Sequence, residues 1–168
     1  MATDEELIAA VARGDEAAFS ALTRRWERAL FQFIHRHTAG RDVDDLYQET
    51  WLRVVHAARR FDPARRFSTW LFQIALNLCR DWHRAQRADP VDPDDLDRMP
   101  AGGGSLDRAI DARRLLAVLP EPQREAVILR YFHDLREDEA AEILGCPRGT
   151  VKSRLHHGLR KLMEIARR

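Results

Sequence analysis

Apolar residues recur at helical spacing along most of the chain, and no stretch alternates apolar and polar residues over several positions. Thr3, followed three residues later by Glu6, predicts the capped start of a first helix that ends at Gly14. Asp15 predicts the cap of a second helix that ends near Gly40. That helix offers four large apolar residues to a core: Phe19, Leu22, Leu30 and Phe33. The pattern predicts an all-α chain.

Two more helices are predicted before residue 89. Asp42 is the expected cap of the third, and Asp62-Pro63 ends it because proline disfavours a helical conformation in the residue before it. Its expected core residues are Val43, Leu46, Leu52 and Val55. The loop DPARRF precedes the fourth helix, for which Ser68 is the expected cap. The apolar stripe of this fourth helix consists of Leu71, Ile74, Leu78 and Trp82.

The composition changes between Asp89 and Ser105, where three prolines and three consecutive glycines leave almost no core-forming residue. Such a segment is typical of a linker, and further helical segments follow it. The sequence therefore predicts two small helical domains, residues 1–88 and 107–168, joined by a flexible acidic linker over residues 89–106.

The segment REDEAAEILGCPRGTVKSRL has the pattern of a helix-turn-helix. Ala141 supplies a small residue where the helices meet, and Gly145 tolerates a positive φ in the turn. Pro147 suits the first turn of the second helix. The inward stripe of that helix is Val151, Leu155, Leu159 and Leu162. The residues turned outward, which suit a DNA major groove, are Lys152, Ser153, His156, His157 and Arg160.

Charge is distributed unevenly, although the chain of 168 residues carries a formal net charge of only +1. Residues 145–168 hold seven Lys or Arg against one Glu, and residues 58–88 hold seven Arg against two Asp. Between them, residues 89–107 hold six Asp against one Arg. Two basic patches separated by an acidic strip favour a polyanionic partner held at two places, with ordinary solvated helix faces as the alternative.

The polar side of the predicted fourth helix is cationic. Its row, at intervals of four, three, four and three residues, is Gln73, Asn77, Arg80, Arg84 and Arg87. Aromatic rings near such a row can stack bases that have left a duplex. Trp70 and Trp82 lie on or beside the apolar stripe and are expected to be packing residues, whereas Phe67, at the junction of loop and helix, is open to either interpretation.

The predicted third helix is acidic at its start, where Asp42, Asp44, Asp45 and Glu49 have no basic residue among them. Acidic groups stabilise a helix N-terminus, which accounts for the three aspartates, but Glu49 lies too far along the helix for that effect. An acidic helix beside basic DNA-binding surfaces is better explained as a protein-docking face.

In this order, the segments resemble the extracytoplasmic-function (ECF) sigma factors of bacteria, the two-domain initiation subunits of RNA polymerase. DVDDLYQETWLRVVHAARRF is similar to the family's core-binding helix, and FSTWLFQIALNLCRDWHR is similar to its F-x-x-W-L-x-x-I-A-x-N-x-x-x-D motif. LPEPQREAVILRYFHDLREDEAAEILGCPRGTVKSRLHHGLRKL resembles its reader of the promoter -35 element. The resemblance implies promoter DNA, core RNA polymerase and a separate anti-sigma factor as partners.

The resemblance also implies site residues. Those expected to bind the β′ clamp helices of the polymerase are Asp42, Asp45, Leu46, Gln48 and Glu49. Those expected to recognise and melt the -10 element are Asp62, Arg65, Arg66, Phe67, Gln73, Asn77, Arg80 and Arg84. Those expected to read the -35 element are Arg148, Thr150, Lys152, Ser153, Arg154, His156, His157 and Arg160. The resemblance further implies the β flap of the polymerase as a contact, and His157 stands where many members carry arginine.

Two other classes of function stay open. A free-standing helix-turn-helix regulator binds duplex operators, usually as a dimer, but the acidic third helix and the melting-type fourth helix weigh against it. An enzyme is the weaker alternative, because Cys79 with His83, or His35 with His37, has no Gly-rich phosphate loop or HExxH motif beside it. We therefore predict no catalytic activity, no cofactor and no metal.

The two cysteines, Cys79 and Cys146, have neither disulfide nor zinc-site spacing. No apolar run approaches the length of a membrane span, and acidic residues stand near the N-terminus where a signal peptide has basic ones. The sequence predicts a cytoplasmic protein. Cys79, beside the apolar stripe, is expected to be buried and inert.

Overall fold

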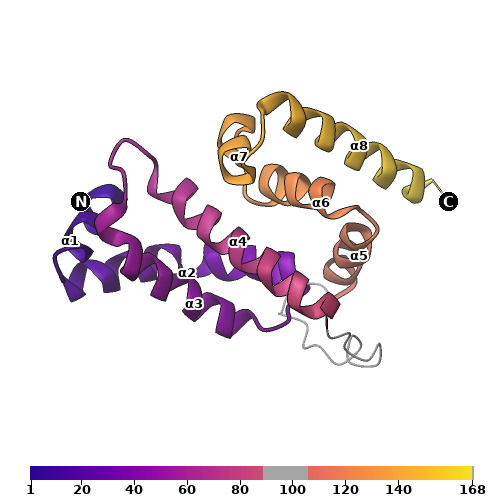
Figure 1. Ribbon diagram of the computed structural model, residues 1–168. Helices are drawn as coiled ribbons and strands as arrows, with labels where there is room; N and C mark the ends of the chain where they lie inside the picture. The colour runs from indigo at the N-terminus through magenta and orange to yellow at the C-terminus, as the bar shows by residue number, and fades with distance from the viewer. Residues whose placement is uncertain (89–105, 168) are drawn as a thin grey trace. The chain divides into compact units, whose positions relative to one another are not determined.

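The computed structural model describes residues 1–88 and 106–167. The chain divides into two compact units, Met1–Ala88 and Asp89–Arg168. Within the described ranges every regular element is helical (Figure 1), which confirms the predicted all-α fold with two helical domains. The predicted linker with its acidic run falls almost wholly in residues 89–105, outside the described residues.

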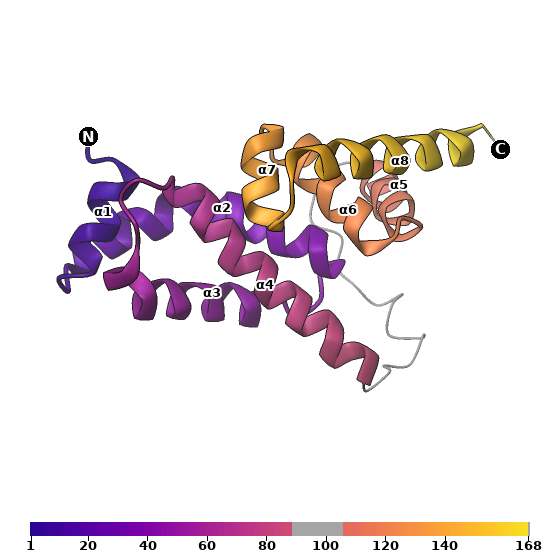
Figure 2. The same cartoon turned by 45° about the horizontal axis from the view of Figure 1, so that its top comes forward.

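The first unit contains four α-helices and one short helical turn. They are α1 (Asp4–Val11), α2 (Glu16–Thr38), α3 (Val43–Ala57), the 3₁₀ turn η1 (Ala58–Arg60) and α4 (Phe67–Ala88). The long helix α2 packs against α1, α3 and α4, and α3 packs along α4, as Figures 1 and 2 show. The loop between η1 and α4 therefore lies at one end of the α3–α4 pair.

The first two helices begin as their sequences predict. Thr3 Oγ1 accepts the Glu6 backbone N–H at 3.1 Å, and the Glu6 carboxylate accepts the Thr3 N–H at 2.8 Å. Asp15 Oδ1 accepts the Ala18 N–H at 3.0 Å. Gly14 makes the turn between the two helices with φ +89°, a conformation that glycine adopts without strain.

The predicted cap of α4 is wrong, and Asp42 occupies the predicted N-cap position of α3 without a capping hydrogen bond. Asp42 precedes α3, but its Oδ2 accepts the Trp82 Nε1–H at 2.7 Å and caps no N–H of α3. The helix α4 begins at Phe67 rather than after Ser68, and the Phe67 N–H donates to Glu5 Oε1 on α1 at 2.9 Å. At α4 a side chain distant in sequence replaces the local cap, and at α3 a distant side chain takes up the carboxylate of the N-cap residue.

The core of the first unit follows the predicted pattern only in part. Most of the predicted core positions of α2, α3 and α4 are buried, including Leu22, Leu30, Phe33, Val43, Leu46, Leu71 and Leu78. On α3, however, the prediction is wrong for Leu52 and Val55, which are 54% and 42% exposed. That helix buries instead Thr50, Trp51 and Val54.

Aromatic rings fill the space between α2 and α4. Phe33 stacks on Phe72 with ring centroids 4.8 Å apart, and Trp26 forms a T-shaped pair with Phe72 at a centroid separation of 5.8 Å. Cys79 is 1% exposed, as the sequence predicts for a residue beside the apolar stripe. Ile74 and Trp82, also predicted for that stripe, are only half-buried.

Within residues 106–167, the described part of the second unit, there are four α-helices. They are α5 (Leu106–Ala117), α6 (Glu121–Val127), which continues as the π-helical turn η3 (Ile128–Phe132), α7 (Glu137–Leu144) and α8 (Arg148–Ala166). The helix α8 packs against α6 and α7. Gly158 permits the close approach to α6, because a Cβ at this position would stand 3.2 Å from Val127 Cγ2.

The turn between α7 and α8 has the predicted helix-turn-helix geometry. Gly145 adopts φ +67°, and the Ala141 carbonyl accepts the Gly145 N–H and, at 3.1 Å, the Cys146 N–H. Val151, the predicted anchor, is 0% exposed, and Leu155 is 7% exposed. Leu159 and Leu162, also predicted to face inward, are only half-buried.

Candidate nucleic-acid and protein-docking surfaces

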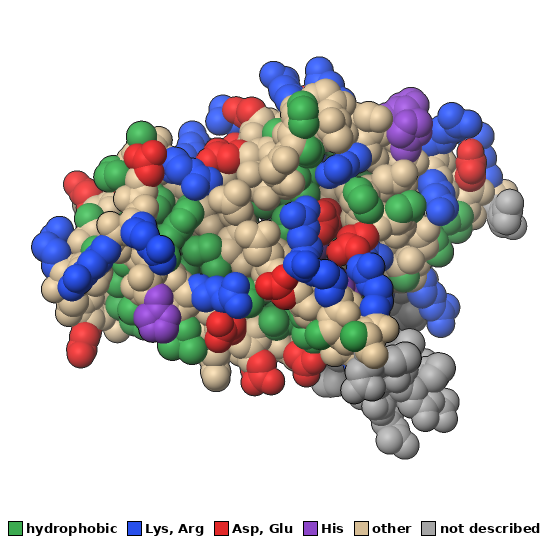
Figure 3. All heavy atoms as spheres, viewed as in Figure 1, with side chains coloured by type: hydrophobic (Ala, Val, Ile, Leu, Met, Phe, Trp, Pro, Cys, Tyr) green, Lys and Arg blue, Asp and Glu red, His purple; other side chains and the backbone are tan. Residues whose placement is uncertain are grey.

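The outer side of α8 is polar and cationic. Arg148, at the start of the helix, is exposed. The five residues predicted to turn outward are also exposed: Lys152, Ser153, His156, His157 and Arg160. Figure 3 shows basic and histidine side chains following one another along this helix. Thr150 and Arg154 are half-buried, and Arg154 Nη1 lies 3.7 Å from Cys146 Sγ. The arrangement suits a helix that enters a DNA major groove.

Two acidic residues partly neutralise this cationic surface, and the contribution of Glu137 was not evident from the sequence. Glu137 Oε2, on α7, lies 3.1 Å from Arg148 Nε and 3.9 Å from Lys152 Nζ. Glu164 Oε1, one turn further along α8, lies 3.6 Å from Arg160 Nε. The positive field of α8 is therefore weaker than a count of its basic residues indicates.

The loop before α4 is held by its own polar side chains. Asp62 Oδ1 accepts the Ala64 N–H at 2.9 Å, which closes a tight turn. Arg65 Nη2 donates to Gln73 Oε1 at 3.0 Å and so joins the loop to α4. Arg66 is exposed. Two of the residues predicted for -10 recognition thus hold each other in place.

Phe67 lies in the core rather than on this surface. The side chain is 0% exposed and lies against the rings of Trp26, Phe61 and Trp70, with centroid separations of 6.1 to 6.2 Å. The ring is therefore not available to a base in this structure. The pattern of residues left Phe67 open to either interpretation, and the family resemblance assigned it to the -10 site. Its burial favours packing.

The cationic row of α4 lies largely at the surface. Asn77, Arg84 and Arg87 are exposed, and Arg80 is half-buried. Arg84 forms an ion pair with Asp81, one turn back on the same helix. A continuous row of this kind can follow a phosphate backbone.

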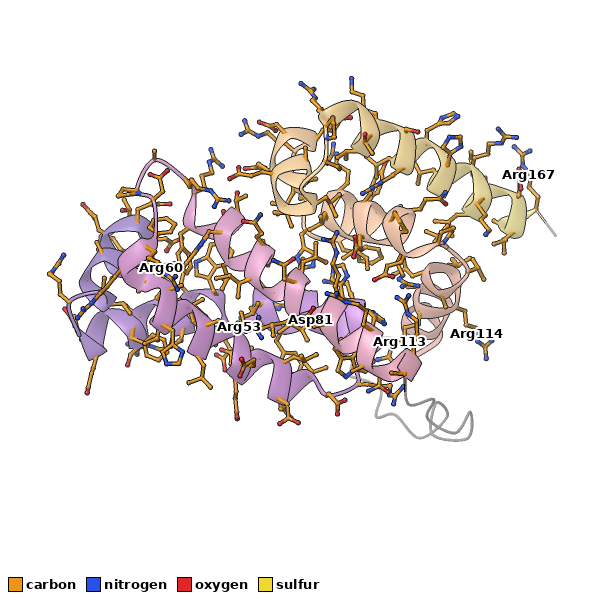
Figure 4. All side chains as sticks on the ribbon, in the orientation of Figure 1. Arg53, Arg60, Asp81, Arg113, Arg114 and Arg167 are labelled. Carbon is orange, nitrogen blue, oxygen red and sulfur yellow. The ribbon has the colours of Figure 1, made fainter. Side chains whose placement is uncertain are left out.

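A hollow of about 300 Å³ lies between α3, η1 and α4. The residues that line it are Arg53, His56, Ala57, Arg60, Trp70, Ile74 and Asn77. Only Asn77 belongs to the predicted site, whereas Trp70 was expected merely to pack. Arg53 and Arg60 come from α3 and η1 (Figure 4), and their spacing of seven residues, two helical turns, is the signal that sequence reasoning missed.

The side of α3 away from the core combines acidic and apolar groups. Asp44, Asp45 and Gln48 are exposed, and Glu49 Oε1 lies 3.1 Å from Arg53 Nε. The exposed Leu52 and Val55 continue the same helix. Leu46, predicted to bind the polymerase, is only 9% exposed, and the Asp42 carboxylate is held by Trp82. An acidic surface with exposed aliphatic residues suits a protein partner.

The residues considered for an enzyme are used in packing. His83 Nε2 lies 2.6 Å from the His37 carbonyl oxygen, and Cys79 is buried. Among the residues that the structure describes, no cluster of three or more His, Cys, Asp or Glu side chains could hold a metal ion. In the same part of the chain, none of the helices has the length and apolarity needed to cross a membrane.

These surfaces, on two helical domains of which the second carries a helix-turn-helix, define a DNA-binding protein of the sigma-70 class. The family models "Sigma-70 region 2" and "Sigma-70, region 4" match residues 22–88 and 110–162. The ECF RNA polymerase sigma-E factors of Escherichia coli K12 and Haemophilus influenzae are 31% and 28% identical to this chain. Each alignment covers 91% of this chain. It also covers 88% of the Escherichia coli protein and 89% of the Haemophilus influenzae protein.

Solved structures agree with this assignment. CnrH in complex with the cytosolic domain of CnrY matches with a TM-score of 0.79 and 30% identity, over 97% of this chain and 96% of CnrH. RpoE of Bartonella quintana, in complex with the anti-sigma factor NepR, matches with a TM-score of 0.75 and 28% identity, over 89% and 96%. The chain belongs to the ECF RNA polymerase sigma factors, as its motifs predicted. Sigma factors are non-catalytic, DNA-binding initiation factors of transcription.

Proposed function

We propose that this chain directs core RNA polymerase to specific promoters and opens their -10 region, without catalytic activity of its own. Residues 1–88 would bind the core enzyme and the -10 element, residues 89–106 would link the domains, and residues 107–168 would read the -35 element. The observation that carries the proposal is the pairing of an acidic, partly apolar face on α3 with a cationic row on α4, within one unit. A free-standing DNA-binding regulator needs only the second of these surfaces.

The proposed polymerase-binding surface is the outer side of α3. Asp45, Gln48 and Glu49 supply its polar contacts, and the exposed Leu52 and Val55 supply apolar area that the sequence had assigned to the core. Leu46 would support this surface from within, and the exposed Asp42, bonded to Trp82, would border it at the start of α3. Complementary charge on the partner, assigned by family resemblance to the β′ clamp helices, would fix the orientation of the complex.

The proposed -10 surface combines the cationic row of α4 with the hollow beside it. Trp70 offers a ring for stacking, Asn77 offers an amide for hydrogen bonds, and Arg53 and Arg60 can meet phosphates at the rim. A volume of about 300 Å³ is at the lower end of small-molecule sites and suits one unstacked base. Asp62, Arg65, Arg66 and Gln73 would order the loop, with Arg80 and Arg84 along the strand.

The proposed -35 surface is the outer side of α8, whose Lys152, Ser153 and His156 lie where base edges would be. Arg148, Arg154 and Arg160 are placed to meet the phosphates. Thr150 and His157 complete the set. On η3, the exposed Tyr131 and Phe132 form an apolar surface suited to the β flap. A separate anti-sigma factor is a further proposed partner, because both solved relatives were determined as complexes.

Charge reversal on α3 tests this proposal. We expect the full chain to co-elute with bacterial core RNA polymerase in gel filtration, and Asp45→Arg to weaken that binding at least about tenfold, since like charges placed opposite one another across an interface cost several kcal/mol. Glu16→Arg makes the same reversal on an exposed residue of α2 and should bind like the wild type. Thermal melting shows whether each variant is folded.

The opposite result would identify a regulator. If the chain ignored the polymerase but bound duplex DNA by itself as a dimer, the initiation-factor proposal would be wrong and the acidic face of α3 would serve a different partner. Action together with the polymerase would also place the chain in the cytoplasm.

A further inference from the structure

One carboxylate stands directly behind the cationic side of α8. Glu137 is the first residue of α7, and its Oε2 lies 3.1 Å from Arg148 Nε and 3.9 Å from Lys152 Nζ. The Glu137 side chain is 26% exposed, whereas Arg148 and Lys152 are 64% and 59% exposed. The carboxylate is thus set back from the solvent, and the two cations project past it.

Two features hold the Glu137 carboxylate in place. The positive end of the α7 dipole stabilises an acidic residue in the first turn. Two cations of a second helix face the same oxygen atom. The hydrogen bond from Arg148 to Glu137 uses Nε of the guanidinium. The guanidinium has further N–H donors on its two terminal nitrogens. The three side chains together carry a net charge of +1, where the two cations alone would carry +2.

We propose that Glu137 is a specificity-determining residue that limits how strongly α8 attracts DNA of arbitrary sequence. The proposal rests on the proposed function of α8 as the -35 reader. Attraction to any duplex grows with the number of phosphates that Lys and Arg neutralise. A carboxylate shared by Arg148 and Lys152 competes with those phosphates. At a correct site, hydrogen bonds to base edges compensate for this competition, and a random site lacks them.

Binding to random DNA tests the proposal. The full chain is titrated into a pool of short duplexes of random sequence, and the association constant is measured at several salt concentrations. Exposed ion pairs contribute up to about 1 kcal/mol, so Glu137→Gln should bind about two- to fivefold more tightly at moderate salt. Its plot of log K against log salt should be steeper by about 0.9, the value for one additional phosphate contact.

A matched variant controls for net charge. Asp134→Asn removes one negative charge from the same unit, as Glu137→Gln does. Asp134 also pairs with an arginine at 3.5 Å, but that residue, Arg130, does not lie on α8. We expect Asp134→Asn to leave both the association constant and the salt slope unchanged. Asparagine tolerates the positive φ of 51° at this position, so the control should fold normally.

A double-mutant cycle shows whether Glu137 acts through its partner. In the Arg148→Ala background, the gain from Glu137→Gln should shrink, because residues that share an interaction are not additive. A merely structural effect of Glu137 would persist in that background. Equal gains in both backgrounds would therefore overturn the proposal.

The remaining outcomes separate this inference from the proposed function. If the wild type binds duplexes and Arg148→Ala weakens binding, but Glu137→Gln leaves the salt slope unchanged or lowers the affinity, then Glu137 does not restrain α8 and the inference fails alone. If Arg148→Ala and Lys152→Ala leave duplex binding unchanged, the assignment of α8 as DNA reader fails, and the inference fails with it.

Discussion

Phe67 belongs to the segment predicted to bind DNA, yet its side chain lies in the core, so replacing it tests whether it stabilises the fold. The side chain is 0% exposed and is enclosed by the rings of Trp26, Phe61 and Trp70. Its backbone N–H donates to Glu5 Oε1, so it also marks the joint between α1 and α4. Replacing it by alanine empties the centre of this aromatic cluster.

The cost follows from burial and from the cavity left behind. Burying a phenylalanine side chain contributes about 1.5–3 kcal/mol, and the unfilled cavity brings the cost of Phe67→Ala to about 3–5 kcal/mol. For a domain of this size each kcal/mol lowers Tm by about 4–8 °C, so the first unit should melt at least about 12 °C lower. Asn77→Ala, at an exposed position of the same helix, should change stability by less than about 0.5 kcal/mol.

Tryptophan fluorescence isolates this measurement to one unit, because all four tryptophans of the chain lie within residues 1–88. Urea and thermal unfolding of the full chain, followed by this signal, give the stability of the first unit for each variant. If Phe67→Ala unfolded like the wild type yet bound single-stranded -10 DNA more weakly, the ring would be a surface contact. The reasoning from burial would then be refuted.

Two further predictions concern the turn of the second unit and the effect of alkaline pH. Gly145→Ala should lower the stability of the second unit by about 1–2 kcal/mol, because φ is +67° there. Gly149→Ala, within α8 and with open space around its Cβ, should raise it by up to about 1 kcal/mol; equal effects in urea unfolding would contradict the turn geometry. Burial raises the pKa of the Tyr47 phenol, so its contribution to stability is complete below the ordinary pKa and is lost as pH rises through the raised one. Tyr47→Phe should therefore lose less stability above about pH 10 than the wild type, measured as Tm against pH, and parallel curves would disprove this.

Local signals in the sequence were sufficient for most helix boundaries. Thr3 with Glu6, Asp15 and Gly145 act within four residues of their partners, so the sequence alone contains both halves of each interaction. The prediction failed where the partner is distant. Glu5 rather than Ser68 caps α4, and Asp42 bonds Trp82 rather than its own helix.

The face of α3 shows how a correct helix can be given a wrong orientation. Val43, Leu46, Leu52 and Val55 form a plausible apolar series, but Thr50, Trp51 and Val54 are the residues buried after Leu46. Spacings of four from Leu46 to Thr50 and from Thr50 to Val54 were legible in the sequence. A threonine in that stripe made it less conspicuous, and the Thr50 hydroxyl donates to the Leu46 carbonyl at 2.7 Å, which satisfies it inside the core.

The sequence by itself determined the helical elements and the helix-turn-helix, because periodicity, caps and turn residues are properties of neighbouring positions. Its motifs, in their order, indicated the ECF sigma factors by resemblance. Only the tertiary structure decided that Phe67 is buried, that Arg53 and Arg60 line a hollow with Asn77, and that Glu137 faces Arg148 and Lys152. These outcomes depend on which helix surfaces meet. Burial and ion pairing depend on the atoms that packing brings together, and these atoms belong to residues far apart in the chain.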